Sequence, residues 1–167
     1  MPAPLAALLL ALGGGAAPAP DIDCVAGLCI DQPFDPATAG DGWQVADWPD
    51  PKLCTQVSGG RLPAGAGMML LDGRIARFEV GLPYGGDATS EAPFGLRPGM
   101  SLAEAGALLP DADVEPQLHK YAWPPGLYFI WRDPARDRAV RIEVPDGVVE
   151  TILWGRAQAV GFSEGCA

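Results

Sequence analysis

Basic side chains are scarce in this chain. Eleven lysines and arginines face 21 aspartates and glutamates, so the formal net charge is −10 at pH 7. Between residues 21 and 50 there are seven acidic side chains and no basic one. Because nucleic-acid binding needs a basic surface to meet the phosphates, the composition argues against a nucleic-acid partner. It also disfavours an anionic membrane surface, whereas solubility or a basic partner protein would suit it.

Long apolar runs are also lacking. Leu5–Leu12 is an apolar run of eight residues, whereas a membrane span needs about 20. No charge occurs in residues 1–20, and glycines and other small residues follow the run, which is typical of a secretory signal. A mis-assigned start codon or a disordered tail is the alternative, because no basic residue precedes the run. We expect a signal peptide over 1–20 and one domain over 21–167, in a bacterial periplasm or the medium.

The cysteines lack the spacing of a metal site. A zinc site needs close pairs of ligands, and here the one histidine is remote from Cys24 and Cys29. An even number of cysteines after an export signal favours disulfides. Of the three possible pairings we favour Cys54–Cys166, which ties the chain end to the sheet, with Cys24–Cys29 closing a small loop. We expect no metal and no cofactor.

Two Asp-Gly pairs mark the strongest strand signals. Asp72-Gly73 separates two apolar runs, as in a tight hairpin turn. The following strand alternates, which predicts a half-buried strand with one face toward water. Its inward residues are Ala76, Phe78 and Val80, and its outward residues are Arg77 and Glu79.

The second pair, Asp146-Gly147, joins a strand over 139–145 to a return strand over 148–154. In the first of these strands Val140, Ile142 and Val144 share one face, and Arg141 and Glu143 take the opposite, outward face. With a further strand over 128–132, these segments predict a meander. Aligning the two turns at an offset of 74 residues places Phe78 over Ile152, Val80 over Trp154 and Gly81 over Gly155. A duplicated hairpin module, over 21–90 and 91–167, would explain this, and the ordinary similarity of hairpins is the alternative.

One helix is predicted, over Leu102–Leu109. Ser101 and Glu104 form a capping box, in which each side chain accepts a hydrogen bond from the other residue's backbone N–H. Those bonds use the donors that an anion would need, so the loop before the helix caps it and is not a phosphate site. The resulting fold class is α+β: a mostly antiparallel sheet with hairpins at Asp72-Gly73 and Asp146-Gly147 and one main helix packed on it.

Catalytic patterns are weak. Gly161–Gly165 reads GxSxG, but a nucleophile elbow needs a strand before it and a helix after it, with its acid and histidine partners downstream. Only two residues follow this segment, and His119 lies upstream. We expect neither Ser163 nor His119 to be catalytic, and we do not expect an enzyme.

Aromatic side chains gather over residues 121–131, beside a charged turn over 132–138. One strand cannot direct all of these rings inward, so some should be exposed and suit a protein or glycan contact. Coverage of the sheet edge and the helix end is the alternative. The expected partner-binding residues are Tyr121, Trp123, Tyr128, Trp131, Arg132 and Arg136.

The stretch that carries Gly95, Gly99, Met100, Ser101 and Glu104 is similar to the helix start in the small secreted modules of β-lactamase inhibitor protein and of small outer-membrane assembly lipoproteins. The chain also resembles uncharacterised secreted proteins that share the order Asp-Gly-Arg, Gly-Leu-Arg-Pro-Gly-Met and Glu-Gly-Cys. The first resemblance implies a helix-plus-sheet fold and an inhibitor or assembly role. However, those modules usually have two helices where one is evident here.

These observations together predict a non-catalytic secreted envelope protein that binds another protein, as an inhibitor or an assembly accessory. The alternative is a periplasmic module that binds a small ligand or a glycan in a cleft between sheet and helix.

Overall fold

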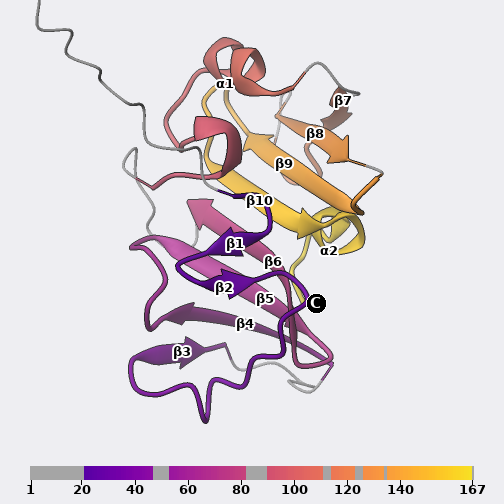
Figure 1. Ribbon diagram of the computed structural model, residues 1–167. Helices are drawn as coiled ribbons and strands as arrows, with labels where there is room; N and C mark the ends of the chain where they lie inside the picture. The colour runs from indigo at the N-terminus through magenta and orange to yellow at the C-terminus, as the bar shows by residue number, and fades with distance from the viewer. Residues whose placement is uncertain are drawn as a thin grey trace, which may run out of the picture.

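The computed structural model describes residues 21–46, 53–81, 90–110, 114–122, 126–133 and 135–166. Within these ranges one antiparallel sheet of eight strands dominates, in the order β3-β4-β5-β6-β10-β9-β8-β7 (Figure 1). Its strands are β3 (Trp43–Val45), β4 (Cys54–Gly59), β5 (Ala66–Leu71), β6 (Arg74–Gly81), β7 (Val114–Leu118), β8 (Leu127–Asp133), β9 (Arg138–Val144) and β10 (Thr151–Arg156). The smaller elements are the hairpin of β1 (Cys24–Val25) and β2 (Leu28–Cys29), the 3-10 turn η1 (Pro93–Gly95), and the helices α1 (Leu102–Leu108) and α2 (Ala157–Gly161). The predicted sheet-dominated α+β class is confirmed.

The sheet consists of two four-stranded meanders. β3 to β6 form the first and β7 to β10 the second, and each strand pairs with the next one along the chain. The last strands of the two meanders, β6 and β10, pair antiparallel at the centre. We call this pairing the seam. The first strands, β3 and β7, are therefore the two outer edges of the sheet.

The strand register repeats at the offset of 74 residues. Met68 pairs with Phe78 in the first meander, and Ile142 pairs with Ile152 in the second. Across the seam Phe78 pairs with Trp154. The residues equivalent to these two at the 74-residue offset are Ile152 and Val80, and they also pair with each other. The two hairpins are thus related by a local two-fold axis. The duplicated origin of the modules remains a prediction.

Two glycines at equivalent places make the seam sterically possible. A Cβ on Gly81 would lie 2.1 Å from the carbonyl oxygen of Glu150, and one on Gly155 would lie 2.5 Å from that of Ala76. Both glycines have left-handed φ values, +109° and +143°. Gly81 and Gly155 are equivalent at the 74-residue offset, and so are Ala76 and Glu150, whose carbonyls they approach. The same close backbone approach therefore occurs twice. A side chain at either glycine would push the meanders apart.

The two predicted hairpin turns differ in form. Asp72 and Gly73 have φ values of +51° and +69°, as a tight two-residue turn requires, and this turn is confirmed. The connection at Asp146-Gly147 is wider, because the return strand begins at Thr151 and not at Val148. Val149 bonds outside the hairpin, since its N–H donates to the Met100 carbonyl (2.8 Å) and its carbonyl accepts from Gly99 (2.8 Å), whereas the Glu150 N–H donates across the hairpin to the Glu143 carbonyl (2.9 Å).

One face of the sheet, which we call face one, packs against the N-terminal hairpin, η1 and α1. Buried side chains from both sides fill this core, among them Phe78, Trp154 and Ile152 from the sheet and Leu28, Leu96 and Ala105 from the covering segments. The predicted capping box is present: Glu104 N–H donates to Ser101 Oγ (3.3 Å), and Ser101 N–H donates to Glu104 Oε2 (2.8 Å). The loop before α1 therefore caps the helix, as expected.

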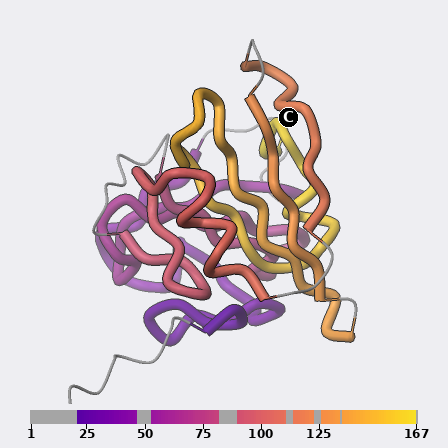
Figure 2. Tube along the Cα trace, turned by 90° about the horizontal axis from the view of Figure 1, so that it is seen from above, coloured from indigo at the N-terminus to yellow at the C-terminus, as the bar shows by residue number. Residues whose placement is uncertain are grey.

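The opposite face, face two, is covered by α2 and the chain end. Figure 2 shows the N-terminal segment and the chain end on opposite sides of the sheet. This cover corrects the expected half-buried strand: Arg77, Glu79 and Arg141 are buried and do not face water. A register shift between Met69 and Leu70 also turns Ala76 to face two, where it packs beside α2. The short helix α2 was not predicted.

Both predicted disulfides are present. Cys24–Cys29 closes the β1–β2 hairpin, and Cys54–Cys166 ties the chain end to β4. The second bond joins residues 112 positions apart, so it removes much of the freedom of the unfolded chain.

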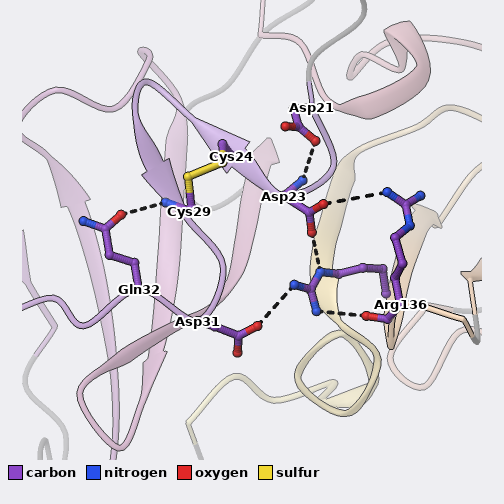
Figure 3. Close-up of a disulfide and its surroundings, with 8 residues drawn as sticks. Asp21, Asp23, Cys24, Cys29, Asp31, Gln32 and Arg136 are labelled. Carbon is purple, nitrogen blue, oxygen red and sulfur yellow. Dashed lines mark hydrogen bonds and ion pairs between the residues drawn. A yellow bond between two sulfur atoms is a disulfide. The ribbon is translucent and has the colours of Figure 1, made fainter.

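Ion pairs attach the N-terminal segment to the second meander, and Figure 3 shows Asp23 directed toward Arg136 (3.7 Å). The guanidinium of Arg138 contacts Asp23 (2.6 Å) and Asp31 (3.2 Å), and Arg156 also pairs with Asp31. Burial alone would raise the pKa of Asp31, but the hydrogen bond and charge of Arg156, with the charge of Arg138, lower it below its ordinary value. The main chain of Asp31 adopts a left-handed φ of +73°. This carboxylate therefore links the N-terminal segment to two strands.

Substitution of the seam glycines tests the close approach. Gly81→Ala and Gly155→Ala should each lower the free energy of unfolding by about 2–4 kcal/mol, because the added methyl meets backbone atoms at a left-handed φ. Urea denaturation measures this value. Gly106→Ala is the control, because a Cβ at this exposed α1 position meets nothing within 4 Å. It should raise the stability by about 0.5–1 kcal/mol. Equal effects at all three glycines would contradict the account.

Acid titration tests the role of Asp31. A lowered folded-state pKa stabilises the fold fully above the unfolded-state pKa, and this contribution disappears as the pH falls through the folded-state value. Asp31→Asn should therefore cost up to about 1 kcal/mol at pH 7, and the difference from the original chain should shrink below pH 4. Urea denaturation at several pH values measures it. Asp72→Asn, also at a left-handed φ and without an ion pair among the described residues, is the control. A difference independent of pH would argue against the ion pairs.

Candidate functional surfaces

The predicted partner-binding residues do not form one surface. Tyr121 is exposed, whereas Tyr128 and Trp131 are buried. Trp123 lies outside the described residues. Arg132 and Arg136 keep 40% and 53% of their side chains exposed. We therefore remove Tyr128 and Trp131 from the proposed contact surface.

The two buried rings belong to opposite faces of β8. Trp131 packs edge-to-face on Phe94 of η1, at a centroid distance of 5.0 Å on face one. Tyr128 lies on face two, 4.3 Å from the His119 ring and 5.0 Å from the Arg141 guanidinium. Burial raises the pKa of Tyr128. The alternation along the strand directs both rings inward because each face has its own cover.

The exposed residues are separated along β8. Tyr121 precedes the strand, whereas Arg136 follows it, and a seven-residue strand spans about 20 Å. Both arginines also have acidic neighbours: Arg132 lies 3.9 Å from Glu115, and Arg136 lies 2.6 Å from Asp133. A single compact interface with a partner therefore cannot have both Tyr121 and Arg136 near its centre.

Edge strand β7 presents two exposed apolar side chains at the outer edge of the second meander. All five of its residues are exposed, and Leu118 and Val114 expose 76% and 36% of their surfaces. Tyr121, just beyond the strand, exposes 60%. We call Val114, Leu118 and Tyr121 the β7 surface. Val114 and Leu118 point to face one, as the Val114 partner Trp131 does, and Tyr121 lies beside the chain end on face two, so the surface wraps around the outer edge of the sheet. β7 was not predicted, because a five-residue segment with a central proline does not resemble a strand.

Pro116 determines how β7 can be contacted. His119 N–H donates to the Gly126 carbonyl (2.8 Å), which places the odd-numbered residues of β7 in hydrogen-bonded pairs. Pro116 is even-numbered, so its nitrogen lies on the outer edge, where an added strand would need an N–H. A proline there blocks extension of the sheet by another chain. A partner would contact the side chains of the β7 surface and not its backbone.

Tyr121 is held to the chain end. The Glu164 carboxylate accepts from the Tyr121 hydroxyl and pairs with Lys120. The hydrogen bond from Lys120 lowers the pKa of Glu164, and the same bond raises that of Lys120. These contacts fix an exposed ring in one orientation, which reduces the entropy that a partner would have to remove.

The segment with the GxSxG spacing has no elbow geometry. Ser163 lies in a turn that follows α2, and the described chain ends at Cys166. His119 lies near Tyr128, and its Nδ1 accepts from the backbone N–H groups of Tyr121 (3.1 Å) and Ala122 (3.0 Å). The histidine therefore holds the loop after β7 in place.

Buried charges under α2 hold the helix against the sheet. Arg77 donates to the carbonyls of Ala159 (2.8 Å) and Phe162 (3.1 Å) and pairs with Glu79 (2.9 Å). Arg141, from the other meander, also donates to the Phe162 carbonyl (3.2 Å). Burial lowers the pKa of Arg141. Positive charge at the C-terminal end of a helix is favourable, so these arginines have a structural role.

A groove opens on face one at the β3 edge. It has two adjoining hollows, of about 450 and 540 Å³, which share Phe34 and Asp35. We call it the Phe34 groove. Its lining includes Pro36, Val45, Leu70 and Asp72 in the smaller hollow and Asp41, Trp43 and Arg61 in the larger one. No local pattern in the sequence indicates that the loop carrying Phe34 meets β3 and β5 there.

No group of histidine, cysteine, aspartate or glutamate side chains is arranged to hold a metal ion within the described ranges. No helix in the described part of the chain is long and apolar enough to span a bilayer.

Comparison of the chain with protein-family models, with curated proteins and with solved structures found no match.

Proposed function

We propose that this chain is a non-catalytic envelope or secreted protein that binds another protein, as an inhibitor or an assembly accessory. The observation that carries the proposal is the β7 surface: an edge strand with exposed apolar side chains and a fixed tyrosine. Tyrosine is common at the centres of protein interfaces, and exposed apolar groups beside it favour contact with a partner. The binding is through side chains, because Pro116 prevents strand addition.

The disulfides support an extracytoplasmic location. Two of them pair all four cysteines, and such bonds form and persist in oxidising compartments. A signal peptide over 1–20 and a periplasmic or secreted location are part of the proposal.

The alternative function, binding of a small ligand or a glycan, was expected in a cleft between sheet and helix. No helix residue lines the Phe34 groove, so ligand binding there would use a different site. The indole of Trp43 is the ring on which a sugar would stack. However, Phe34 packs edge-to-face against it at 4.9 Å, and a Cβ on Gly60 would lie 2.3 Å from it. Phe34 and Gly60 of the chain itself therefore already cover the Trp43 ring on which a sugar would stack. Protein binding is the better supported function for this reason.

A capture experiment tests the proposal. The oxidised chain from Asp21 is the bait, cell-envelope extract from its own organism is the source, and mass spectrometry identifies what is retained. We expect one stoichiometric protein partner, and Leu118→Ser with Tyr121→Ser should lower its retention about tenfold, as loss of interface anchors does. Val148→Ser is the control, because Val148 is also exposed (45%) but lies in the β9–β10 connection. A blank with the original chain, or full retention by the double variant, would contradict the proposal.

A further inference from the structure

We propose that the Phe34 groove binds an extended peptide segment of a partner protein in which basic side chains flank an apolar one. The groove lies at the β3 edge, whereas the β7 surface lies at the opposite edge of the same sheet. The inference therefore goes beyond the proposed function and does not depend on the β7 surface.

The floor of the groove is apolar and only partly covered. Val45 exposes 49% of its surface, and Phe34, which packs against the core of face one, is half-buried. Leu70 and Pro36 also line the smaller hollow. An apolar side chain placed there would remove this area from water, at about 25 cal/mol for each Å² buried.

The groove is lined by three aspartates and one arginine, Arg61, so its net charge is negative. Asp35, Asp41 and Asp72 line it, and none of them makes an ion pair within the described residues. Elsewhere acidic side chains such as Asp23, Asp31 and Glu164 are paired with cations. The excess negative charge of the chain is therefore available at this groove, where basic side chains of a partner would find complementary charge.

Two details define the occupant further. Asp35 is held in place, because it accepts from the Ala37 N–H (3.0 Å) and the Thr38 hydroxyl (3.2 Å). Arg61 lines the larger hollow and would repel a basic side chain of the partner there. A basic side chain of the partner is therefore favoured beside Asp72 in the smaller hollow. Adjoining hollows suit an extended segment, whose alternate side chains lie about 7 Å apart on one side.

Fluorescence polarisation with a defined probe tests the inference. The probe is a labelled five-residue peptide with arginine at positions 1 and 5, leucine at position 3 and serine at positions 2 and 4, so that the leucine and its two flanking arginines share one side of the extended chain. The control peptide has glutamates in place of the arginines. We expect saturable 1:1 binding of the arginine peptide alone. Asp72→Asn should weaken it about threefold, as expected for an exposed ion pair, and Asp72→Asn with Asp41→Asn should weaken it about tenfold. Val45→Ser should weaken it as well.

The matched control is Asp146→Asn. Asp146 is exposed and followed by glycine in the other hairpin connection, as Asp72 is, but it lies outside the groove. Unchanged affinity in this variant supports the groove. Equal weakening by Asp146→Asn and Asp72→Asn would show general charge attraction and overturn the inference. Absence of saturable binding, or binding of a cell-wall glycan fragment in place of the peptide, would also overturn it. None of these results depends on capture through the β7 surface.

Discussion

β6 and β10 run side by side at the centre of the sheet, close enough that two glycines, Gly81 and Gly155, are needed to let their backbones meet. Each of these strands is the last strand of a four-stranded meander. A single antiparallel pairing therefore converts two meanders into one eight-stranded sheet. The two-fold relation across the seam means that a side chain added at either glycine would disturb the same kind of contact.

The buried charges follow from this arrangement. Arg77 of the first meander and Arg141 of the second both donate to the carbonyl of Phe162, so the end of α2 is bound to both meanders. Buried ionic groups cost free energy unless they are paired and hydrogen-bonded, as these are with Glu79 and Glu143. The seam and the chain end thus form a fixed centre, and both proposed binding surfaces lie at the outer edges.

Local patterns were sufficient for much of the fold. The Asp72-Gly73 turn, the capping box of Ser101 and Glu104, and the β8–β9–β10 meander depend on neighbouring residues, and the sequence predicted them. The disulfide pairs were also predicted. Arg77 and Arg141 were expected to face water because alternation reveals which residues share a face but not what covers that face. The cover, α2, is only five residues long and has no capping side chain.

The predicted site was less successful for a related reason. An aromatic cluster in sequence indicates rings that lie close together along the chain, but the pleat of β8 separates Tyr128 from Trp131 by the thickness of the sheet. The Phe34 groove and strand β7 were missed because each depends on contacts between distant segments. Their positions follow from the pairing order of the whole sheet, which no single stretch of sequence determines.

Native-state amide hydrogen exchange tests most directly whether the seam makes the two meanders one unit. If it does, the amides of β6 and β10 should exchange slowest and at a common rate, set by global unfolding, while those of β3 and β7 exchange much faster. Exchange of one complete meander while the other stays protected would contradict a single unit joined at the seam.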